Sequence, residues 1–299
     1  MHAPHDHQDH AGHSHAPVTF DQAFAIGVGL NLAYVIGEAI AGLIVHSVAL
    51  LADAGHNLGD VLGLLVAWGG AALARREPSK RFTYGLKSST ILAALLNALL
   101  LLVALGAILL EAGNRIAVPT PVDGWAVSAV AAGGIAVNAA TAMLFAHGRR
   151  GDLNVRAAFL HMAGDAVVSA GVVVSGLVIW ATGASWLDPV TSIVIVVLIF
   201  WQTWGLLRET VEMSLDAVPR GIDYDRVAAA LAALPDVTAT HDLHIWPMST
   251  TETVLTAHLV MAAEPDAGFL AAAQEMLRKR FGIRHSTLQI EHEDCAQDC

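Results

Sequence analysis

The sequence has little charge for its length. Only 14% of its 299 residues are Asp, Glu, Lys or Arg, whereas 55% are hydrophobic, and the mean hydropathy is +0.55. Soluble domains are about one quarter charged, so this chain lacks the polar surface that contact with water requires. The composition therefore excludes a soluble enzyme with a single core and predicts an α-helical membrane protein.

Basic residues and cysteines are also scarce. Sixteen Lys and Arg stand against twenty-seven Asp and Glu, which gives a formal net charge of −11. Nucleic-acid binding depends on basic stripes that displace counterions from phosphates, so nucleic acid is excluded as a partner. The two cysteines, Cys295 and Cys299, lie at the extreme C-terminus, so no disulfide framework stabilises the fold.

Histidine, in contrast, is abundant at the N-terminus. Six of the fifteen histidines fall in the first fifteen residues: His2, His5, His7, His10, His13 and His15. This head has no basic n-region, and the apolar run after it is too long for a signal peptide. A disordered tail is expected over residues 1–17. It is either a solvated low-complexity segment or, as we favour, a tract that captures metal weakly through its imidazoles.

Six apolar segments are long enough to cross a bilayer core of about 30 Å. They occupy residues 20–45, 47–74, 88–111, 124–146, 154–182 and 187–206. A six-helix transmembrane domain is therefore predicted over residues 18–207, with the lipid bilayer as its environment.

The orientation follows from the short connections. Eight basic residues lie in or beside the second-to-third and fourth-to-fifth connections: Arg75, Arg76, Lys80, Arg81, Lys87, Arg149, Arg150 and Arg156. The opposite side has only Arg115. Because basic loops favour the cytoplasm, both termini are predicted to be cytoplasmic and the protein to lie in the inner, or plasma, membrane.

Residues 208–299 regain the composition of a soluble domain. Amphipathic periodicity predicts helices over residues 224–234 and 267–281, and alternation predicts strands over residues 237–245, 253–261 and 286–290. We expect a small cytosolic α+β domain, ferredoxin-like in class, with its helices on one sheet.

Two polar motifs interrupt the apolar spans at identical spacing. The second span contains His56 and Asp60, and the fifth contains His161 and Asp165. Residues i and i+4 share one face of a helix, so each motif directs an imidazole and a carboxylate to the same side. An ionised Asp near the bilayer centre costs roughly 2.5–3.5 kcal/mol on insertion scales, and no Lys or Arg lies near the middle of a span to neutralise it.

A divalent cation can supply the missing positive charge. Two neutral imidazoles and two carboxylates make a neutral, tetrahedral N2O2 set that suits Zn²⁺ and is poor for Mg²⁺ or Ca²⁺. The alternative is that these residues only make interhelical hydrogen bonds. Two matched pairs favour the metal site. Glu38, Asn31 and Asn97 on neighbouring spans are expected to make packing or water contacts.

Four stretches of the chain are characteristic: SVALLADAGHNLGDVLGLLVAW, RFTYGLKSSTILAALLNALLLL, LNVRAAFLHMAGDAVVSAGV and HDLHIW. With them the chain resembles the cation diffusion facilitator family, specifically its bacterial zinc-exporting branch. This resemblance implies six transmembrane helices, a cytosolic C-terminal domain, a homodimer, and exchange of cytosolic Zn²⁺ for external protons by alternating access. The family's transport site matches His56, Asp60, His161 and Asp165, and two histidines there favour zinc over a broader choice of metal.

The resemblance also implies metal sites in the C-terminal domain. Relatives bind zinc at positions that match His241, His258 and His285, and His292 matches a place where an acidic ligand is often found. Cys295 and Cys299 follow in a C-x3-C spacing and are candidate ligands. The alternative for each histidine is an ordinary surface or core residue. The loop RREPSKRFTYG has no suitable ligand pair, so no site is expected there.

Other function classes fit less well. A membrane metalloenzyme needs an open zinc position and a general base, as in H-E-x-x-H, and no span contains that motif, so no enzyme activity is predicted. A broader Cd²⁺ or Co²⁺ exporter, a passive channel, and a metal sensor without transport stay open, because binding and carrying use the same ligands.

Overall fold

The structure is a computed structural model that describes residues 20–146 and 153–292. The histidine-rich head, Cys295 and Cys299 lie outside the described residues. The chain divides into two compact units, the first containing Met1–Ala54 and Pro119–Thr191 and the second containing Gly55–Val118 and Ser192–Cys299.

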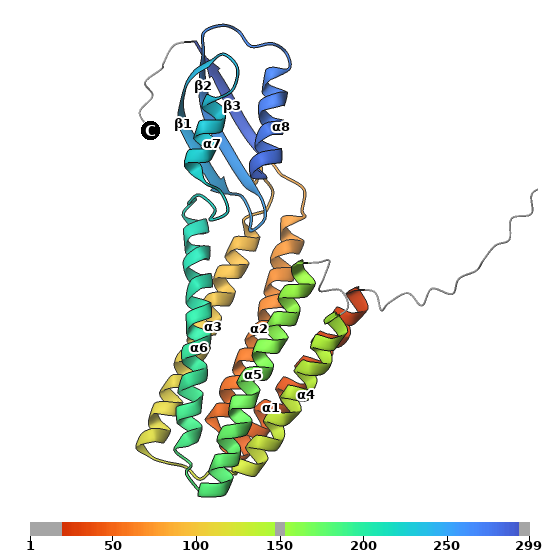
Figure 1. Cartoon of the computed structure of the whole chain (residues 1–299), viewed down its shortest axis with the longest axis vertical. Coiled ribbons are helices and arrows are strands. Elements are labelled where there is room, and N and C mark those ends of the chain that lie inside the picture. Colours follow the sequence, from red (N-terminus) through yellow and green to blue (C-terminus); the bar gives the residue numbers. More distant parts are fainter. Residues whose placement is uncertain (1–19, 147–152, 293–299) are drawn as a thin grey trace, which may run out of the picture. The chain divides into compact units, whose positions relative to one another are not determined.

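The first unit is helical. It contains α1 (Phe20–Ile44), the beginning of α2 (Val48–Ala74), α4 (Gly124–Ala146) and α5 (Leu153–Thr182). Helix α4 lies along α5, and α1 packs against α4 (Figure 1). The α4–α5 backbones approach closely because glycine provides the space: a Cβ at Gly176 would lie 2.9 Å from the Ser128 nitrogen.

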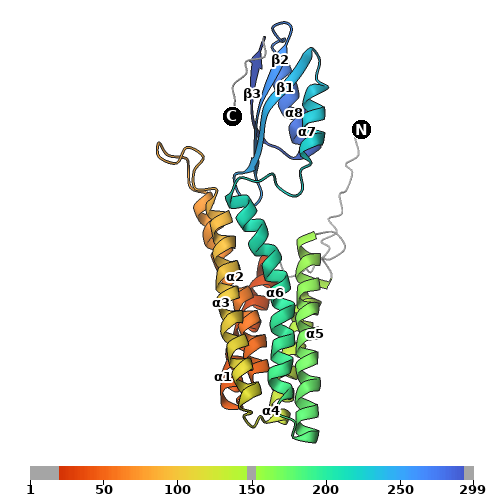
Figure 2. The same cartoon turned by 90° about the vertical axis from the view of Figure 1, so that its left-hand side faces the viewer.

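In the second unit, the rest of α2 packs against α3 (Ser89–Ala117) (Figure 2). Glycines on α2 make this contact close. A Cβ at Gly63 would lie 2.7 Å from the Asn97 amide nitrogen, and one at Gly70 would lie 3.0 Å from the Ser89 carbonyl oxygen. Asn97 therefore packs against α2, as expected.

The C-terminal domain follows α6 (Leu187–Ser214). Its elements are α7 (Tyr224–Ala232), β1 (Val237–Pro247), β2 (Thr253–Met261), α8 (Phe269–Phe281) and β3 (His285–Glu291). The strand order is β1-β2-β3, with β1 and β2 antiparallel and β2 and β3 parallel. Helices α7 and α8 cover one face of this sheet (Figure 2). The predicted α+β domain is confirmed.

The core of this domain lies between the helices and the sheet. It is formed by Val227, Leu231, Leu243, Ile245, Leu255, Ala257, Leu259, Leu277 and Ile283. The N-terminus of α7 is fixed by the Asp223 side chain, which accepts a hydrogen bond from the Arg226 nitrogen. Helix α8 ends at Gly282, whose φ of 72° is the left-handed conformation that glycine adopts most readily.

Within the described residues, α2 to α6 are each long and apolar enough to cross a membrane, and the described apolar part of α1, Gly29–Ile44, is shorter. The helices that contain the third and sixth predicted spans extend beyond those spans. Helix α3 continues to Ala117 and α6 to Ser214 because charged residues lower hydropathy without ending a helix. Pairs at i and i+4, Glu111–Arg115 and Arg208–Glu212, both at 2.8 Å, support these extra turns.

Candidate metal centres

The first predicted ligand pair lies on α2. The His56 Nε2 and Asp60 Oδ2 atoms are 3.7 Å apart, and these side chains are 10% and 30% exposed. The imidazole and the carboxylate therefore lie on the same side of the helix, as the spacing of one turn predicts.

The second predicted pair lies on α5, in the other unit. This helix is continuous through positions 161 and 165, so the two positions are one turn apart. Asp165 is buried, with 4% of its surface exposed. The side chain of His161 lies outside the described part of the structure.

Further buried carboxyl groups in the first unit were not assigned to a site from the sequence. Asp53 is fully buried and its Oδ2 accepts a hydrogen bond from the Ser169 hydroxyl at 2.9 Å. Asp188 is also fully buried, and it accepts bonds from the Ser47 hydroxyl and from the Val48 nitrogen at the start of α2. Asp188 therefore caps α2, which is a structural role.

A three-residue cluster in the C-terminal domain has metal-ligand chemistry. One ligand atom each from His241, His258 and Glu291 lies within 4.8 Å of the other two. Glu291 Oε2 is 2.9 Å from His241 Nε2, and Glu291 Oε1 is 3.0 Å from His258 Nδ1. Two imidazoles and a carboxylate make a set that suits zinc.

Strand pairing explains how this cluster forms. His241 on β1 is directly opposite His258 on β2, and Glu291 at the end of β3 pairs with Val260, two residues from His258. The register of β1 then shifts, and Asp242 adopts a left-handed φ of 51°. This conformation, which Asp tolerates better than most residues, brings Asp242 Oδ2 to 3.5 Å from His258 Nε2. Asp242 also contacts His244 at 2.8 Å.

The electrostatics of Glu291 suit a ligand. Burial alone would raise the pKa of this carboxyl, but hydrogen bonds from His241 and Gln289 and the charges of His258 and His241 outweigh it and lower the pKa. Because the pKa is lowered on folding, this group stabilises the domain above the ordinary carboxyl pKa, and the contribution is lost as the pH falls through the lowered value. Glu291 is therefore ionised at neutral pH.

Two histidines predicted as ligands lie elsewhere. His285 is at the opposite end of the sheet, paired with Val254, and its ring contacts Tyr84 at 5.4 Å. His292 contacts Glu264 at 3.1 Å and the Met261 carbonyl oxygen at 3.2 Å; its pKa is raised, mainly by Glu264. Neither joins the cluster formed by the described residues.

Glu291 and Asp242 were missed in the sequence. The expected acidic ligand was placed at position 292, one residue after Glu291, and a one-residue change of register reverses the face of a strand. The run EHED near the end of the chain was the available signal.

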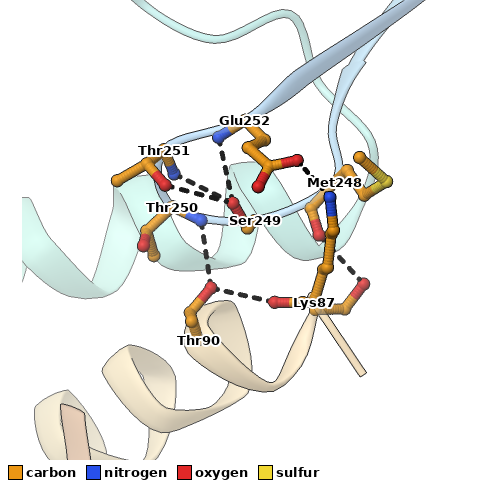
Figure 3. Close-up of polar contacts among 8 residues, drawn as sticks. Lys87, Thr90, Met248, Ser249, Thr250, Thr251 and Glu252 are labelled. Atoms are coloured by element: carbon orange, nitrogen blue, oxygen red, sulfur yellow. Dashed lines mark hydrogen bonds and ion pairs between the residues drawn. The ribbon is translucent and has the colours of Figure 1, made fainter. Parts of the chain in front are cut away.

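The same end of the sheet that carries His285 contacts the first turn of α3 (Figure 3). Lys87 Nζ pairs with Glu252 Oε2 at 2.5 Å, and the Thr250 nitrogen donates to the Thr90 hydroxyl at 3.1 Å. The β1–β2 turn is held in shape by Ser249, whose hydroxyl accepts a bond from the Glu252 nitrogen. The hydrogen bonds within the turn thus fix the shape in which it contacts α3.

We expect the Lys87–Glu252 pair to contribute about 0–1 kcal/mol, since both side chains are partly exposed. Lys87→Glu should lower the melting temperature by placing two carboxylates together, and Glu252→Lys in the same chain should restore it. A double-mutant cycle on the full-length protein measures this coupling, with Lys80→Glu as an exposed control in the same loop. No rescue in the double variant would contradict the pairing.

Comparison with known proteins identifies the family. The model for the cation efflux transmembrane domain matches residues 24–213, and the model for the cation efflux protein, cytoplasmic domain, matches residues 219–293. The chain belongs to the cation efflux family, and the resemblance found in the sequence is confirmed.

Three relatives cover nearly the whole chain. The cation efflux system protein CzcD of Alcaligenes sp. (strain CT14) is 33% identical over 96% of this chain and 92% of its own length. The zinc transporter ZitB of Escherichia coli (strain K12) is 35% identical over 93% and 88%. A cadmium, cobalt and zinc/H(+)-K(+) antiporter of Bacillus velezensis is 30% identical over 93% and 91%. This chain is therefore a multi-span cation efflux transporter and not an enzyme.

A solved structure, the metal-bound C-terminal domain of the CzcD transporter from Cuprividus metallidurans, is 36% identical to this chain. It covers 23% of this chain and 99% of that one, with a TM-score of 0.22.

Proposed function

We propose that this transporter exports Zn²⁺ from the cytosol across the bacterial inner membrane in exchange for protons, by alternating access. The ion binds His56, Asp60, His161 and Asp165. The observation that supports this most directly is the His56–Asp60 pair within an apolar helix, whose spacing recurs at positions 161 and 165. The names of the ZitB and antiporter relatives agree with zinc as cargo and protons as counter-ions.

The geometry of the α2 pair suits one ion. Zn–N and Zn–O bonds of about 2.0–2.2 Å at the tetrahedral angle place two ligand atoms roughly 3.4 Å apart. The His56 and Asp60 atoms, at 3.7 Å, need little movement to reach this separation. The two carboxylates balance the charge of the ion and the two imidazoles stay neutral. The complex of the ion with its four ligands therefore has no net charge within the apolar bundle.

Proton exchange follows from the same charges. Once zinc leaves, the charges of Asp60 and Asp165 are no longer balanced within the apolar bundle, and protons can take the place of the cation. Zinc arriving from the cytosol displaces these protons, and protons from outside displace zinc. An imidazole of the site can carry one of them.

The cluster of His241, His258 and Glu291 is proposed as a regulatory zinc site. We also propose that the protein works as a homodimer, since the matched cytoplasmic domain is the dimerisation domain of this family. Zinc can favour one dimer arrangement only by binding it more tightly than the other. Both termini are assigned to the cytoplasm, where the histidine-rich tail would raise the local metal concentration.

A broader choice of divalent cation is the second candidate, because relatives are named for cobalt and cadmium as well as zinc. A sensor without transport would bind the same ion without moving it. Zinc flux into proteoliposomes under an imposed pH gradient separates transport from sensing. We expect uphill zinc movement that collapses when the gradient is removed. Zinc uptake that ignores the gradient would contradict the exchange.

Metal choice should depend on the histidines. His56→Asp converts the N2O2 set into a harder, more negative NO3 set, which should admit Mn²⁺ and Cd²⁺ better because the imidazole favours zinc. Competition between divalent ions in the flux assay measures the rank order for wild type and variant. An unchanged rank order would assign selectivity to the surrounding helices instead.

A further inference from the structure

Strand β1 is irregular directly beside the C-terminal cluster. Between the pair His241–His258 and the next pair along the strands, two residues of β1 lie opposite one residue of β2, which is a β-bulge. Asp242, the first of these two residues, has a positive φ of 51°. Bulges re-aim side chains, and a left-handed residue is held at a cost in free energy, so both features direct attention to what Asp242 contacts.

The bulge changes the face of the sheet on which Asp242 lies. In a regular strand, His241 and Leu243 would share one face and Asp242 would lie on the other. Here Leu243 belongs to the core between the sheet and helices α7 and α8 (Figure 2). His241 lies opposite His258, whose two neighbours on β2 are both in that core, so these histidines point to the other face. The extra residue brings Asp242 to the face of the two histidines.

Asp242 directs one carboxylate oxygen toward each of two histidines. Its Oδ2 is 3.5 Å from His258 Nε2, slightly longer than an ordinary hydrogen bond, and its Oδ1 is 2.8 Å from His244 Nε2. The side chains of Asp242 and His258 are 20% and 14% exposed, so water screens their contact little. Histidines that bind a metal commonly donate their second ring hydrogen to a carboxylate, which fixes the orientation of the ring.

The other ring nitrogen of His258 faces the metal-ligand cluster. Nδ1 is buried and lies 3.0 Å from Glu291 Oε1, yet it makes no hydrogen bond with any residue that the structure describes. A neutral imidazole carries a single hydrogen, on one nitrogen or the other. On Nδ1 that hydrogen would be buried without an acceptor, which is unfavourable, whereas on Nε2 it faces Asp242. The favoured arrangement therefore leaves the lone pair of Nδ1 available to an ion.

We propose that Asp242 is a positioning residue of the cytoplasmic metal site and acts through His258. It accepts the Nε2 hydrogen of that ring and keeps Nδ1 directed at the ion, while His244 holds its second oxygen in place. Its charge also complements that of Glu291, so the two carboxylates together balance a divalent cation. The effect on zinc rests on the proposed regulatory site, whereas the orientation of the His258 ring is a property of the metal-free domain.

The first test measures zinc affinity by calorimetric titration of a chain in which the cytoplasmic domain alone binds. This chain lacks residues 2–15 and carries Asp60→Asn and Asp165→Asn. Asp242→Asn is suited to the test because Asn also tolerates a positive φ, but its single oxygen cannot accept hydrogen bonds from both His244 and His258. We expect zinc to bind about tenfold more weakly. The melting temperature of the metal-free variant checks its folding.

A second variant and a matched control complete this test. Asp242→Gly removes the carboxylate altogether and suits the same φ, so it should weaken zinc binding at least as much. Asp236 also has a positive φ, 61°, and lies outside the cluster, so Asp236→Asn should keep the wild-type affinity. Wild-type affinity in both Asp242 variants would overturn the proposal.

A spectroscopic measurement separates positioning from a merely structural role. Nitrogen-15 NMR of the zinc-free, histidine-labelled chain distinguishes a ring nitrogen that carries hydrogen from one that does not, at mildly alkaline pH where imidazole is neutral. The His258 signals, identified by their loss in His258→Gln, should show the hydrogen on Nε2 in wild type and a larger share on Nδ1 in Asp242→Asn. A wild-type hydrogen on Nδ1 would overturn the proposal. If Glu291→Gln leaves the zinc affinity unchanged, the proposed zinc site fails, and the NMR signals still decide whether Asp242 orients His258.

Discussion

Zinc transport should fall to background when Asp60 or Asp165 is replaced by Asn. Each substitution keeps the shape of the side chain and removes one negative charge and one carboxylate ligand. The remaining residues then hold Zn²⁺ with a net positive charge inside an apolar bundle, which the membrane environment strongly disfavours. Removing a residue that only hydrogen-bonds to a metal ligand lowers metal affinity or activity by roughly 10- to 100-fold. Removing the ligand itself should therefore have a larger effect.

The measurement is initial zinc flux into proteoliposomes, with insertion checked by the amount of folded protein recovered. Asp123→Asn is a matched control, because it removes the same charge from an exposed carboxylate that caps α4. It should transport at the wild-type rate. A folded Asp60→Asn or Asp165→Asn variant that transports near that rate would exclude the motif as the zinc site.

Most of the fold could be predicted from the sequence because a membrane-spanning helix can be recognised from its apolar composition alone. A span needs about twenty apolar residues whatever its neighbours are, so α4 was predicted to the residue. The ends of α3 and α6 were not predicted, since a helix continues past the apolar stretch wherever charges pair along its surface. The Arg208–Glu212 pair is such a case, and hydropathy cannot detect it.

The two candidate sites also differ in how far they could be predicted from local sequence. The pair His56 and Asp60 depends on helical spacing alone, which is a local property of the sequence. The cluster in the C-terminal domain depends on which residues of three strands lie side by side. The bulge at Asp242 and the parallel pairing of β2 with β3 decide this, and neither is visible in a single strand. The family resemblance therefore predicted His241 and His258 as ligands, whereas Glu291 was not predicted.

The second large effect is expected on zinc binding by the cluster of His241, His258 and Glu291. In a chain that lacks residues 2–15 and also carries Asp60→Asn and Asp165→Asn, neither the histidine-rich tail nor the membrane site binds zinc, so calorimetric titration with zinc reports the cytoplasmic domain. Glu291→Gln should then weaken zinc binding by at least about tenfold. The amide keeps the shape of the side chain but lacks the negative charge that balances the ion between two neutral imidazoles. His241→Ala and His258→Ala should weaken binding further, because each removes a nitrogen ligand and leaves a gap.

The matched controls are His285→Ala and His292→Ala in the same background. His285 contacts Tyr84 at the far end of the sheet and His292 contacts Glu264, so neither substitution should change the zinc affinity. The ligand set expected from the sequence and the cluster in the structure therefore predict different results for His285 and His292, and the same result for His241 and His258. If His285→Ala weakens binding as much as His241→Ala does, zinc must draw β3 into a different register from the one seen here. In that case Glu291 would lose its place in the site.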